Sequence, residues 1–315
     1  MNKLHTSAAP HINSGATTHK VMRDVAIALL PATIAAIVLF GLEALWIVLV
    51  CVGSAVLAEF LFNLILNKKQ TIFDFSAVVT GLILALNLST KVPLWVCAIG
   101  SVFAIIVVKC LFGGLGKNIV NPAIGARVFL LLAFGSVVTG GANTVFELTS
   151  SATPLGGEGV IATGDYNLLT LLIGNHGGAI GETCAIALLL GYVYLVARGH
   201  IKWYVPFAFV ATVFVLFFVT TWDIGYATAQ VLAGGLLLGA IFMATDYVTT
   251  PISKLGKVVF CIGCGVITYV IRMQYFGFEG LATYPEGVSI AILVMNLLTP
   301  LIEKWTNPRT LGGVK

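Results

Sequence analysis

A run of small polar residues, Glu147 to Pro154, lies in a glycine-rich loop of about forty residues between Thr139 and Ile180. Small side chains precede Thr153, and Pro154 disfavours helical backbone at that threonine. A modifying enzyme can reach a hydroxyl on such exposed, non-helical chain. An ordinary Ser/Thr-rich loop outside a membrane has the same composition, so the run alone leaves both interpretations open.

Two aspartates are accompanied by hydroxyl side chains. Asp246 is followed by threonines, and Asp74 is followed by Ser76 and Thr80. Carboxylate, hydroxyl and freed backbone carbonyl oxygens form a set of hard ligands that suits Na⁺ or a proton. Capping of helix starts is the competing role. We interpret Asp74, Thr80 and Asp246 as candidates for an ion pathway, with the two aspartates at equivalent places in two halves of the chain.

The segment 109–122 combines a cation, glycines and amides. Lys109 ends an apolar run, Gly113 and Gly114 follow it, and Asn118 and Asn121 come next. A compact glycine loop can turn its backbone N–H groups towards an anion or the edge of an aromatic ring system. A tight turn between two helices is the alternative.

Ionisable residues inside apolar runs are energetically costly and are often functional. Lys109, Arg127 and Arg272 lie within or at the edge of such runs, as do Glu59 and Glu182. We expect the cations to snorkel or to pair with these carboxylates, and Arg127 can equally meet a phosphate. Which carboxylate pairs with which cation stays open.

The six cysteines all lie in apolar segments, where they are interpreted as small apolar residues. Cys261 and Cys264 have the spacing of a redox or metal-binding pair, but no further ligand type accompanies them. The sequence therefore predicts no metal site, and it offers no catalytic residue.

The composition indicates a polytopic membrane protein. Of the 315 residues, 58% are hydrophobic and 10% are charged, and the mean hydropathy is +1.01. A soluble domain of this length does not bury so much apolar surface. Ten apolar runs predict an all-α protein with about ten transmembrane helices: 24–42, 45–66, 76–89, 93–112, 122–139, 180–197, 204–221, 228–245, 257–275 and 287–304.

The distribution of basic residues predicts the orientation. With a cytoplasmic N-terminus, thirteen of the 17 Lys and Arg residues fall in cytoplasmic tails and loops, and only Lys91 falls in an outer loop. This asymmetry follows the positive-inside rule. It places both termini in the cytoplasm and the loop around Thr153 on the extracytoplasmic side.

The two halves of the chain show a weak internal repeat. Lys109 and Arg272 are 163 residues apart, as are Pro122 and Pro285, and similar residues surround each pair. Five spans per half is an odd number, so the second half is inverted relative to the first. We therefore expect two inverted five-helix repeats with broken helices and a binding site between them.

Several stretches resemble one known family, which holds the D subunit of Rnf complexes and the B subunit of the sodium-pumping NADH:quinone reductase. The blocks are residues 7–15, 74–81, 109–122, 147–154 and 242–251. The block 109–122 is the most distinctive, and the matches follow the family's order. The absence of a longer N-terminal region favours the Rnf member.

The resemblance implies a flavoprotein. In this family the threonine that matches Thr153 carries FMN through a phosphoester, and Ser151 stands where Gly is more common. A second, non-covalent flavin, riboflavin, is a further implied cofactor. The resemblance also implies a cofactor-binding set beside Thr153: Ser151, Lys109, Gly113, Gly114, Asn118, Asn121 and Arg127.

The implied protein is an electron-transfer subunit of an ion-translocating ferredoxin:NAD⁺ oxidoreductase in the inner (cytoplasmic) membrane, which couples electron flow to Na⁺ or H⁺ transport. Its implied partners are the other Rnf membrane subunits, a second flavinylated subunit and iron–sulfur subunits. The expected organisation is a cytoplasmic tail (1–23), a first membrane repeat (24–139), a flavin-bearing loop (140–179), a second membrane repeat (180–305) and a cytoplasmic tail (306–315).

Two other functions fit the same architecture. A secondary transporter or channel without a flavin also uses inverted repeats with broken spans, since a fold does not determine a function. A purely structural anchor for other subunits is the third interpretation. A fluorescent band from denatured protein distinguishes the flavoprotein from the transporter.

Overall fold

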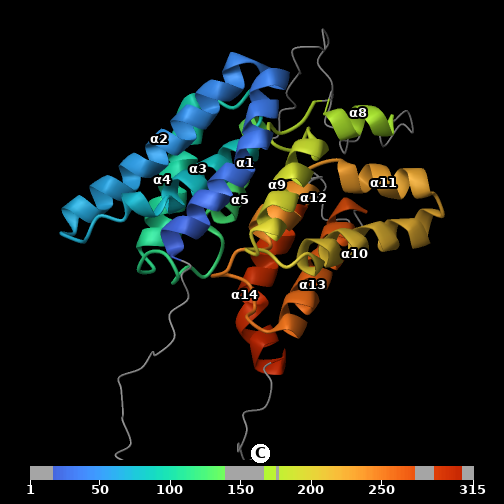
Figure 1. Ribbon diagram of the computed structural model, residues 1–315. Helices are drawn as coiled ribbons and strands as arrows, with labels where there is room; N and C mark the ends of the chain where they lie inside the picture. Colours follow the sequence, from blue (N-terminus) through green and yellow to red (C-terminus); the bar gives the residue numbers. More distant parts are fainter. Residues whose placement is uncertain (1–16, 139–166, 175–176, 274–286, 307–315) are drawn as a thin grey trace, which may run out of the picture.

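The computed structural model describes residues 17–138, 167–174, 177–273 and 287–306. Within these ranges every regular element is a helix, and none is a strand. The helices form one bundle in which two groups lie side by side, one from each half of the chain (Figure 1). The expected all-α fold is therefore confirmed.

The first half contributes helices to each of the first five predicted spans. The first, α1, begins at Thr18 because the Thr17 side chain accepts a hydrogen bond from the Lys20 N–H. The helices are α1 (Thr18–Phe40), α2 (Leu42–Ile65), the short η1 (Ile72–Asp74), α3 (Ser76–Leu86), α4 (Leu94–Phe103) with the π-helical η2 (Ala104–Cys110), α5 (Pro122–Ala133) and α6 (Gly135–Val138).

The second half contributes the other five. The predicted span 204–221 coincides with α10. The predicted span 228–245 is instead broken between α11 and α12, with a bend of 65°. The helices are α8 (Leu168–Ile173), α9 (Ala185–Ala197), α10 (Tyr204–Thr221), α11 (Ile224–Leu232), α12 (Leu236–Leu238) with the π-helical η3 (Gly239–Met243), α13 (Lys254–Arg272) and α14 (Val288–Thr306).

The helices differ in whether they can cross a membrane alone. Within the described residues, five helices are long and apolar enough to do so, and the bent pair makes a sixth candidate. The other four are shorter apolar helices of 10–17 residues: Ser76–Leu86, Leu94–Cys110, Pro122–Ala133 and Ala185–Ala197. The chain is thus a multi-pass membrane protein. In these four apolar runs, however, the helix is shorter than the predicted span.

The packing of the two halves matches the expected repeat. Helix α2 packs against α3 and α4, as α10 packs against α11 and α13 in the second half. Likewise, α4 contacts α5, and α13 contacts α14. Across the two halves α1 meets α9 and α5 meets α14, so these two helices of the first half contact their counterparts in the second. This pattern of contacts is the one that a pseudo-twofold axis generates.

Glycine permits the closest approach between the halves. A Cβ atom on Gly191 of α9 would lie 2.3 Å from the backbone oxygen of Ala28 on α1 and 2.9 Å from the ring of Phe242. Ala28 is 1% exposed, so the two backbones meet without an intervening side chain. This contact positions α1 and α9 on either side of the cavity described next.

Candidate functional site

A cavity lies between the two halves of the bundle. Its atom-free volume is about 760 Å³, counting its open mouth, and its walls are mostly aliphatic side chains. The polar side chains that line this central cavity come from both halves: Ser76, Thr80, Lys109, Asn118, Asn121, His200, Thr245, Asp246 and Tyr247.

Lys109 lies at the end of η2 and reaches the central cavity. Its ammonium group donates to Glu59 Oε1 at 2.8 Å and to Ser76 Oγ at 2.7 Å. The side chains of Lys109 and Glu59 are each only 2% exposed. A buried charge requires such a partner, because losing it leaves an uncompensated ion in a poorly solvated place. The expected pairing of a cation with a carboxylate is therefore confirmed for Lys109 and Glu59.

The two asparagines of the glycine-rich segment have different roles. Asn121 caps α5, because its Oδ1 accepts the Ala123 N–H at 3.0 Å. Asn118 is 8% exposed, and its buried Oδ1 has no hydrogen-bond partner within the described part of the chain. Since buried polar atoms are nearly always paired, Asn118 offers an acceptor to a ligand in the central cavity.

Gly113 and Gly114 form a turn between η2 and α5. Both have positive φ angles, 111° and 90°. The Gly113 N–H donates to the Cys110 carbonyl at 3.1 Å, and the Gly114 N–H donates to the Lys109 carbonyl at 3.0 Å. These two donors are thus used within the turn, as the alternative interpretation expects, and neither glycine lines the central cavity.

Arg127, Arg272 and the cysteine pair on α13 lie away from the central cavity. Arg127 is 2% exposed in α5 and does not line the central cavity. Arg272, at the end of α13, donates to the backbone carbonyl of Gln230, to its Oε1 at 3.3 Å and to the Ala233 carbonyl at 3.2 Å. It thereby joins α13 to the break after α11. Cys261 and Cys264 are both buried and free on α13.

The ion-pathway candidates divide between two cavities. Thr80 and Asp246 both line the central cavity. Asp74 instead lines a separate, more polar hollow with Glu59, Asn63 and Thr71. The expected equivalence of Asp74 and Asp246 is wrong, because Asp74 precedes α3 whereas Asp246 follows the broken helix that corresponds to it.

Asp246 lies in a turn just beyond η3. Its carboxylate accepts the Val248 N–H at 3.3 Å and the Thr249 hydroxyl at 3.2 Å. The Thr249 carbonyl in turn accepts the Thr299 hydroxyl of α14 at 2.9 Å. Burial raises the pKa of Asp246 above the ordinary value of 3.8, although these two hydrogen bonds act in the opposite direction. The carboxyl is therefore protonated at a higher pH than a solvated aspartate is.

Thr153 and Ser151 lie outside the described residues, within the undescribed segment 139–166. Their predicted roles therefore stay predictions. The chain as a whole does, however, match known proteins. A family model described as the NQR2, RnfD, RnfE family matches residues 5–312.

The chain belongs to this family. It is 42% identical to the D subunit of the Na⁺-translocating ferredoxin:NAD⁺ oxidoreductase complex of Acetobacterium woodii, over 100% of this chain and 98% of that protein. It is 35% identical to the D subunit of the proton-translocating ferredoxin:NAD⁺ oxidoreductase complex of Clostridium ljungdahlii, over 99% of this chain and 97% of that protein. It is 32% identical to the D subunit of an ion-translocating oxidoreductase complex of Methanosarcina acetivorans, over 100% of this chain and 99% of that protein.

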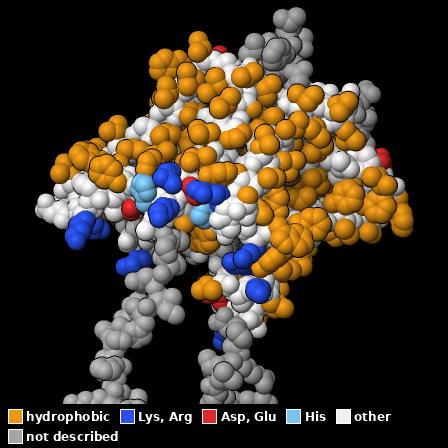
Figure 2. Space-filling view, in the orientation of Figure 1, with side chains coloured by type: hydrophobic (Ala, Val, Ile, Leu, Met, Phe, Trp, Pro, Cys, Tyr) orange, Lys and Arg blue, Asp and Glu red, His pale blue; other side chains and the backbone are white. Residues whose placement is uncertain are grey.

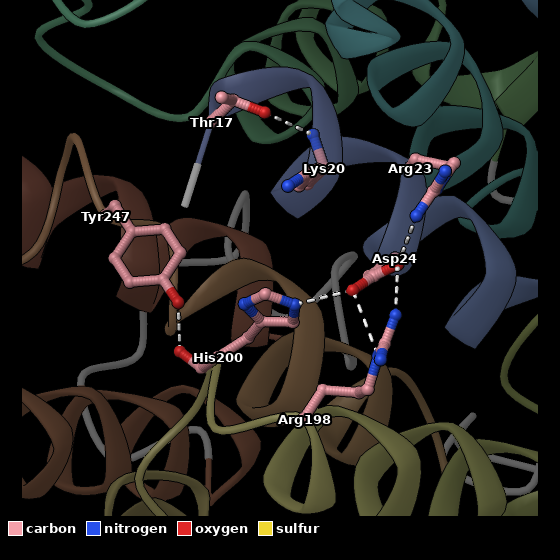
Figure 3. Close-up of polar contacts among 7 residues, drawn as sticks. All are labelled: Thr17, Lys20, Arg23, Asp24, Arg198, His200 and Tyr247. Atoms are coloured by element: carbon pink, nitrogen blue, oxygen red, sulfur yellow. Dashed lines mark hydrogen bonds and ion pairs between the residues drawn. The ribbon is translucent and has the colours of Figure 1, made fainter. Parts of the chain in front are cut away.

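This member of the NQR2, RnfD, RnfE family also has a polar cluster that its sequence did not reveal. Asp24 of α1 is buried, and its carboxylate accepts from Arg198 Nε at 3.2 Å and lies 2.8 Å from His200 Nε2 (Figure 3). The Tyr247 hydroxyl donates to the His200 carbonyl. Because these partners are 174 and 176 residues from Asp24 in the sequence, spacing did not reveal them. A carboxylate in an apolar helix was the available signal.

Proposed function

We propose that this chain is the D-type membrane subunit of an Rnf-type ferredoxin:NAD⁺ oxidoreductase, and that it carries FMN through a phosphoester on Thr153. Its family membership and the printed names of its relatives support this proposal. The proposed partners are the other Rnf membrane subunits, a second flavinylated subunit and iron–sulfur subunits. The proposed location is the cytoplasmic membrane, with both termini in the cytoplasm and Thr153 on the extracytoplasmic side.

The observation that best supports an electron-transfer role is the central cavity between the two halves. Its residues fit a second, non-covalent flavin such as riboflavin. Asn118 supplies a buried acceptor without a partner, Lys109 supplies a cation, and the aliphatic walls suit a flat ring system. A bound flavin would supply one- and two-electron chemistry, while the protein orients it and sets its electrostatic surroundings.

The arrangement of charges around the central cavity suggests how electron flow is coupled to ion movement. Lys109 is shared between the cavity and Glu59, and Asp246 lies on the opposite half of the same cavity. A carboxylate at this place can hold Na⁺ or a proton, with Thr80 and Thr245 as neighbouring hydroxyl groups. Negative charge that a reduced flavin adds to the cavity would favour the binding of Na⁺ or a proton at Asp246. We therefore propose that Asp246 couples electron flow to ion movement.

In-gel fluorescence tests the covalent flavin. The chain is produced together with its flavin-attaching enzyme, denatured, separated on a gel and viewed under ultraviolet light before staining. We expect a fluorescent band for the wild type and for Thr149→Ala, a matched change in the same loop, and a dark band for Thr153→Ala. A dark wild-type band, or a fluorescent Thr153→Ala band, would contradict the assignment.

A flavin-free secondary transporter is the second candidate function. It is favoured by one observation, the cavity that holds polar side chains from both halves and lies where α1 meets α9 and α5 meets α14. The same gel separates the candidates, because a transporter gives a dark band. A purely structural anchor would instead allow full electron transfer by a complex that contains Thr153→Ala.

A further inference from the structure

The outer face of α1 carries two cations followed by a hydrophobic stripe. Lys20, Arg23, Ile27, Leu30 and Ile34 recur at spacings of three and four residues, which places them on one face of the helix. The three apolar side chains are exposed, at 39%, 48% and 59%. At a rise of 1.5 Å per residue, the stripe extends about 16 Å beyond Arg23, roughly half of a bilayer's hydrocarbon core.

Helix α9 provides a second stripe beside the first. Arg198, Tyr194, Leu190 and Ile186 recur every four residues, so they also share one face. Arg198 lies over the Tyr194 ring, 5.8 Å from its centre, and Leu190 and Ile186 are 58% and 43% exposed. Helices α1 and α9 pack against each other, and the contact between Arg198 and Asp24 joins the end of α9 to the start of α1. Both stripes therefore begin at the same end of the bundle.

A crevice separates the charged ends of these two stripes. It is lined by Lys20, Val21, Arg23, Asp24, Arg198 and His200, and its atom-free volume is about 450 Å³, counting its open side. Figure 3 shows Arg23, Arg198 and His200 around the Asp24 carboxylate, with Lys20 further along α1. Figure 2 shows Lys, Arg and His side chains gathered on the visible face, with hydrophobic side chains covering the surface above them.

The lining of the crevice carries more positive than negative charge. The Asp24 carboxylate is 3.8 Å from Arg23 Nη2 and 3.2 Å from Arg198 Nε, and Lys20 adds a third cation to the same wall. The lining thus holds one carboxylate and three cations even when His200 is neutral. The first turn of α1 holds no acidic residue, although its N-terminus attracts negative charge. An anion bound there would compensate both the helix dipole and the basic lining.

We propose that this crevice binds the phosphate of an anionic phospholipid, whose acyl chains lie along the stripes of α1 and α9. A basic pocket between membrane helices, at the level of the lipid headgroups, is a recognised site for anionic lipids. The adjoining exposed apolar stripes favour a lipid over a free anion, because a free anion leaves them uncovered. The crevice adjoins the central cavity, with which it shares Val21 and His200 in its lining, but the proposal does not depend on a flavin bound there.

Native mass spectrometry of the detergent-extracted complex tests this site, with dioleoyl phosphatidylglycerol and dioleoyl phosphatidylcholine as probes. We expect the wild type to retain phosphatidylglycerol preferentially. In Lys20→Gln/Arg23→Gln the affinity for phosphatidylglycerol falls by about thirtyfold, since each basic residue at a membrane surface contributes about a factor of five to ten. Both side chains are exposed, and Arg198 and His200 still hold Asp24, so the variant keeps its fold.

A matched control distinguishes binding in the crevice from the general attraction of anionic lipids to basic residues at the membrane surface. Lys254 and Lys257 have the same spacing in the first turn of α13 but do not line this crevice. Lys254→Gln/Lys257→Gln should retain phosphatidylglycerol as the wild type does. The proposal is wrong if the two double variants lose affinity equally, or if the wild type binds both lipids equally. It is also wrong if inorganic phosphate alone is retained, or if the Lys20/Arg23 variant loses a protein subunit while its lipid preference is unchanged.

Discussion

At the scale of single residues, Lys109 connects the structural network of the first half to the central cavity. Its ammonium group is held by Glu59 and Ser76, and Glu59 also accepts the Thr71 hydroxyl. The sequence identified Lys109 as a candidate and Glu59 as a possible partner, because both are charged residues in apolar runs. Because the pair is buried, changing either residue alone should cost stability.

Removing one member of this pair should destabilise the protein more than removing both. Lys109→Met leaves Glu59 charged and buried, which costs roughly 3–5 kcal/mol, whereas Lys109→Met/Glu59→Met leaves no buried ion. We expect a much lower midpoint of thermal unfolding for Lys109→Met and partial recovery in the double variant. Lys91→Met, at an exposed position, serves as the control. A double variant that is no more stable than Lys109→Met would contradict this account of the pair.

Asn118 should control the non-covalent flavin without affecting the covalent one. Asn118→Leu removes the buried acceptor in the central cavity. We expect acid extraction of the purified complex to release severalfold less riboflavin per molecule, while FMN on Thr153 stays at the wild-type level. Asn167→Leu, which removes an exposed helix cap, should release the normal amount. Unchanged riboflavin in Asn118→Leu would exclude Asn118 from a flavin site.

At the scale of elements, two features of the second half shape the central cavity. The span after α10 breaks between α11 and α12, and its last turn, η3, is π-helical. Local π-helical turns occur frequently at functional sites, because they turn side chains away from the regular helix positions. The break leads into the turn that carries Asp246. Hydropathy alone predicted a span here but not its bend.

Asp246→Asn tests whether this turn takes part in ion coupling. The variant cannot release a proton or hold Na⁺ with a full negative charge, so electron-driven uptake of ²²Na⁺ or H⁺ per electron should fall severalfold. The raised pKa means that the wild-type carboxyl takes up a proton as the pH falls through a value above 3.8, and Na⁺ uptake should weaken over that window. The variant should lack this pH dependence. Asp223→Asn removes the same charge near the start of α11 and keeps a side-chain oxygen to cap that helix, so it is the matched control.

Unchanged uptake by Asp246→Asn would remove this residue from the ion pathway. A loss of equal size in Asp223→Asn would show instead that the effect is not specific to Asp246.

The contact between α1 and α9 makes a prediction about packing. Gly191→Ala places a Cβ 2.3 Å from the Ala28 backbone oxygen, so the two helices must separate, which costs about 1–3 kcal/mol. We expect a lower midpoint of thermal unfolding. Gly53→Ala, in α2 with no atom within 4 Å of the new Cβ, should be neutral or slightly stabilising. Equal midpoints for the two variants would show that the halves do not meet closely at Gly191.

At the scale of the whole molecule, much of the architecture could be predicted from hydrophobic runs. All ten runs contain helices, because apolar chain in a membrane must satisfy its backbone hydrogen bonds internally. The repeat was indicated by Lys109 and Arg272, which end corresponding helices. The run 76–89 is by itself too short for a full crossing, and it forms the short helix Ser76–Leu86. Hydropathy did not reveal that three further runs form short helices.

The candidate site was less predictable than the fold. Sequence blocks identified Lys109, Asn118, Thr80 and Asp246, and the fold brings these residues to one cavity. Gly113 and Gly114 were grouped with them by proximity in sequence, yet their N–H groups complete a local turn. The Asp24 cluster was missed because its members come from opposite halves, and no local pattern records a contact over so long a separation.

The central claim of this account is that Thr153 carries an electron carrier through its phosphate. Mass spectrometry of the peptide that spans residues 139–180, from protein purified from its native host, tests that claim most directly. The account predicts an added FMN mass localised on Thr153. An unmodified Thr153, with the flavin absent from the whole peptide, would contradict it.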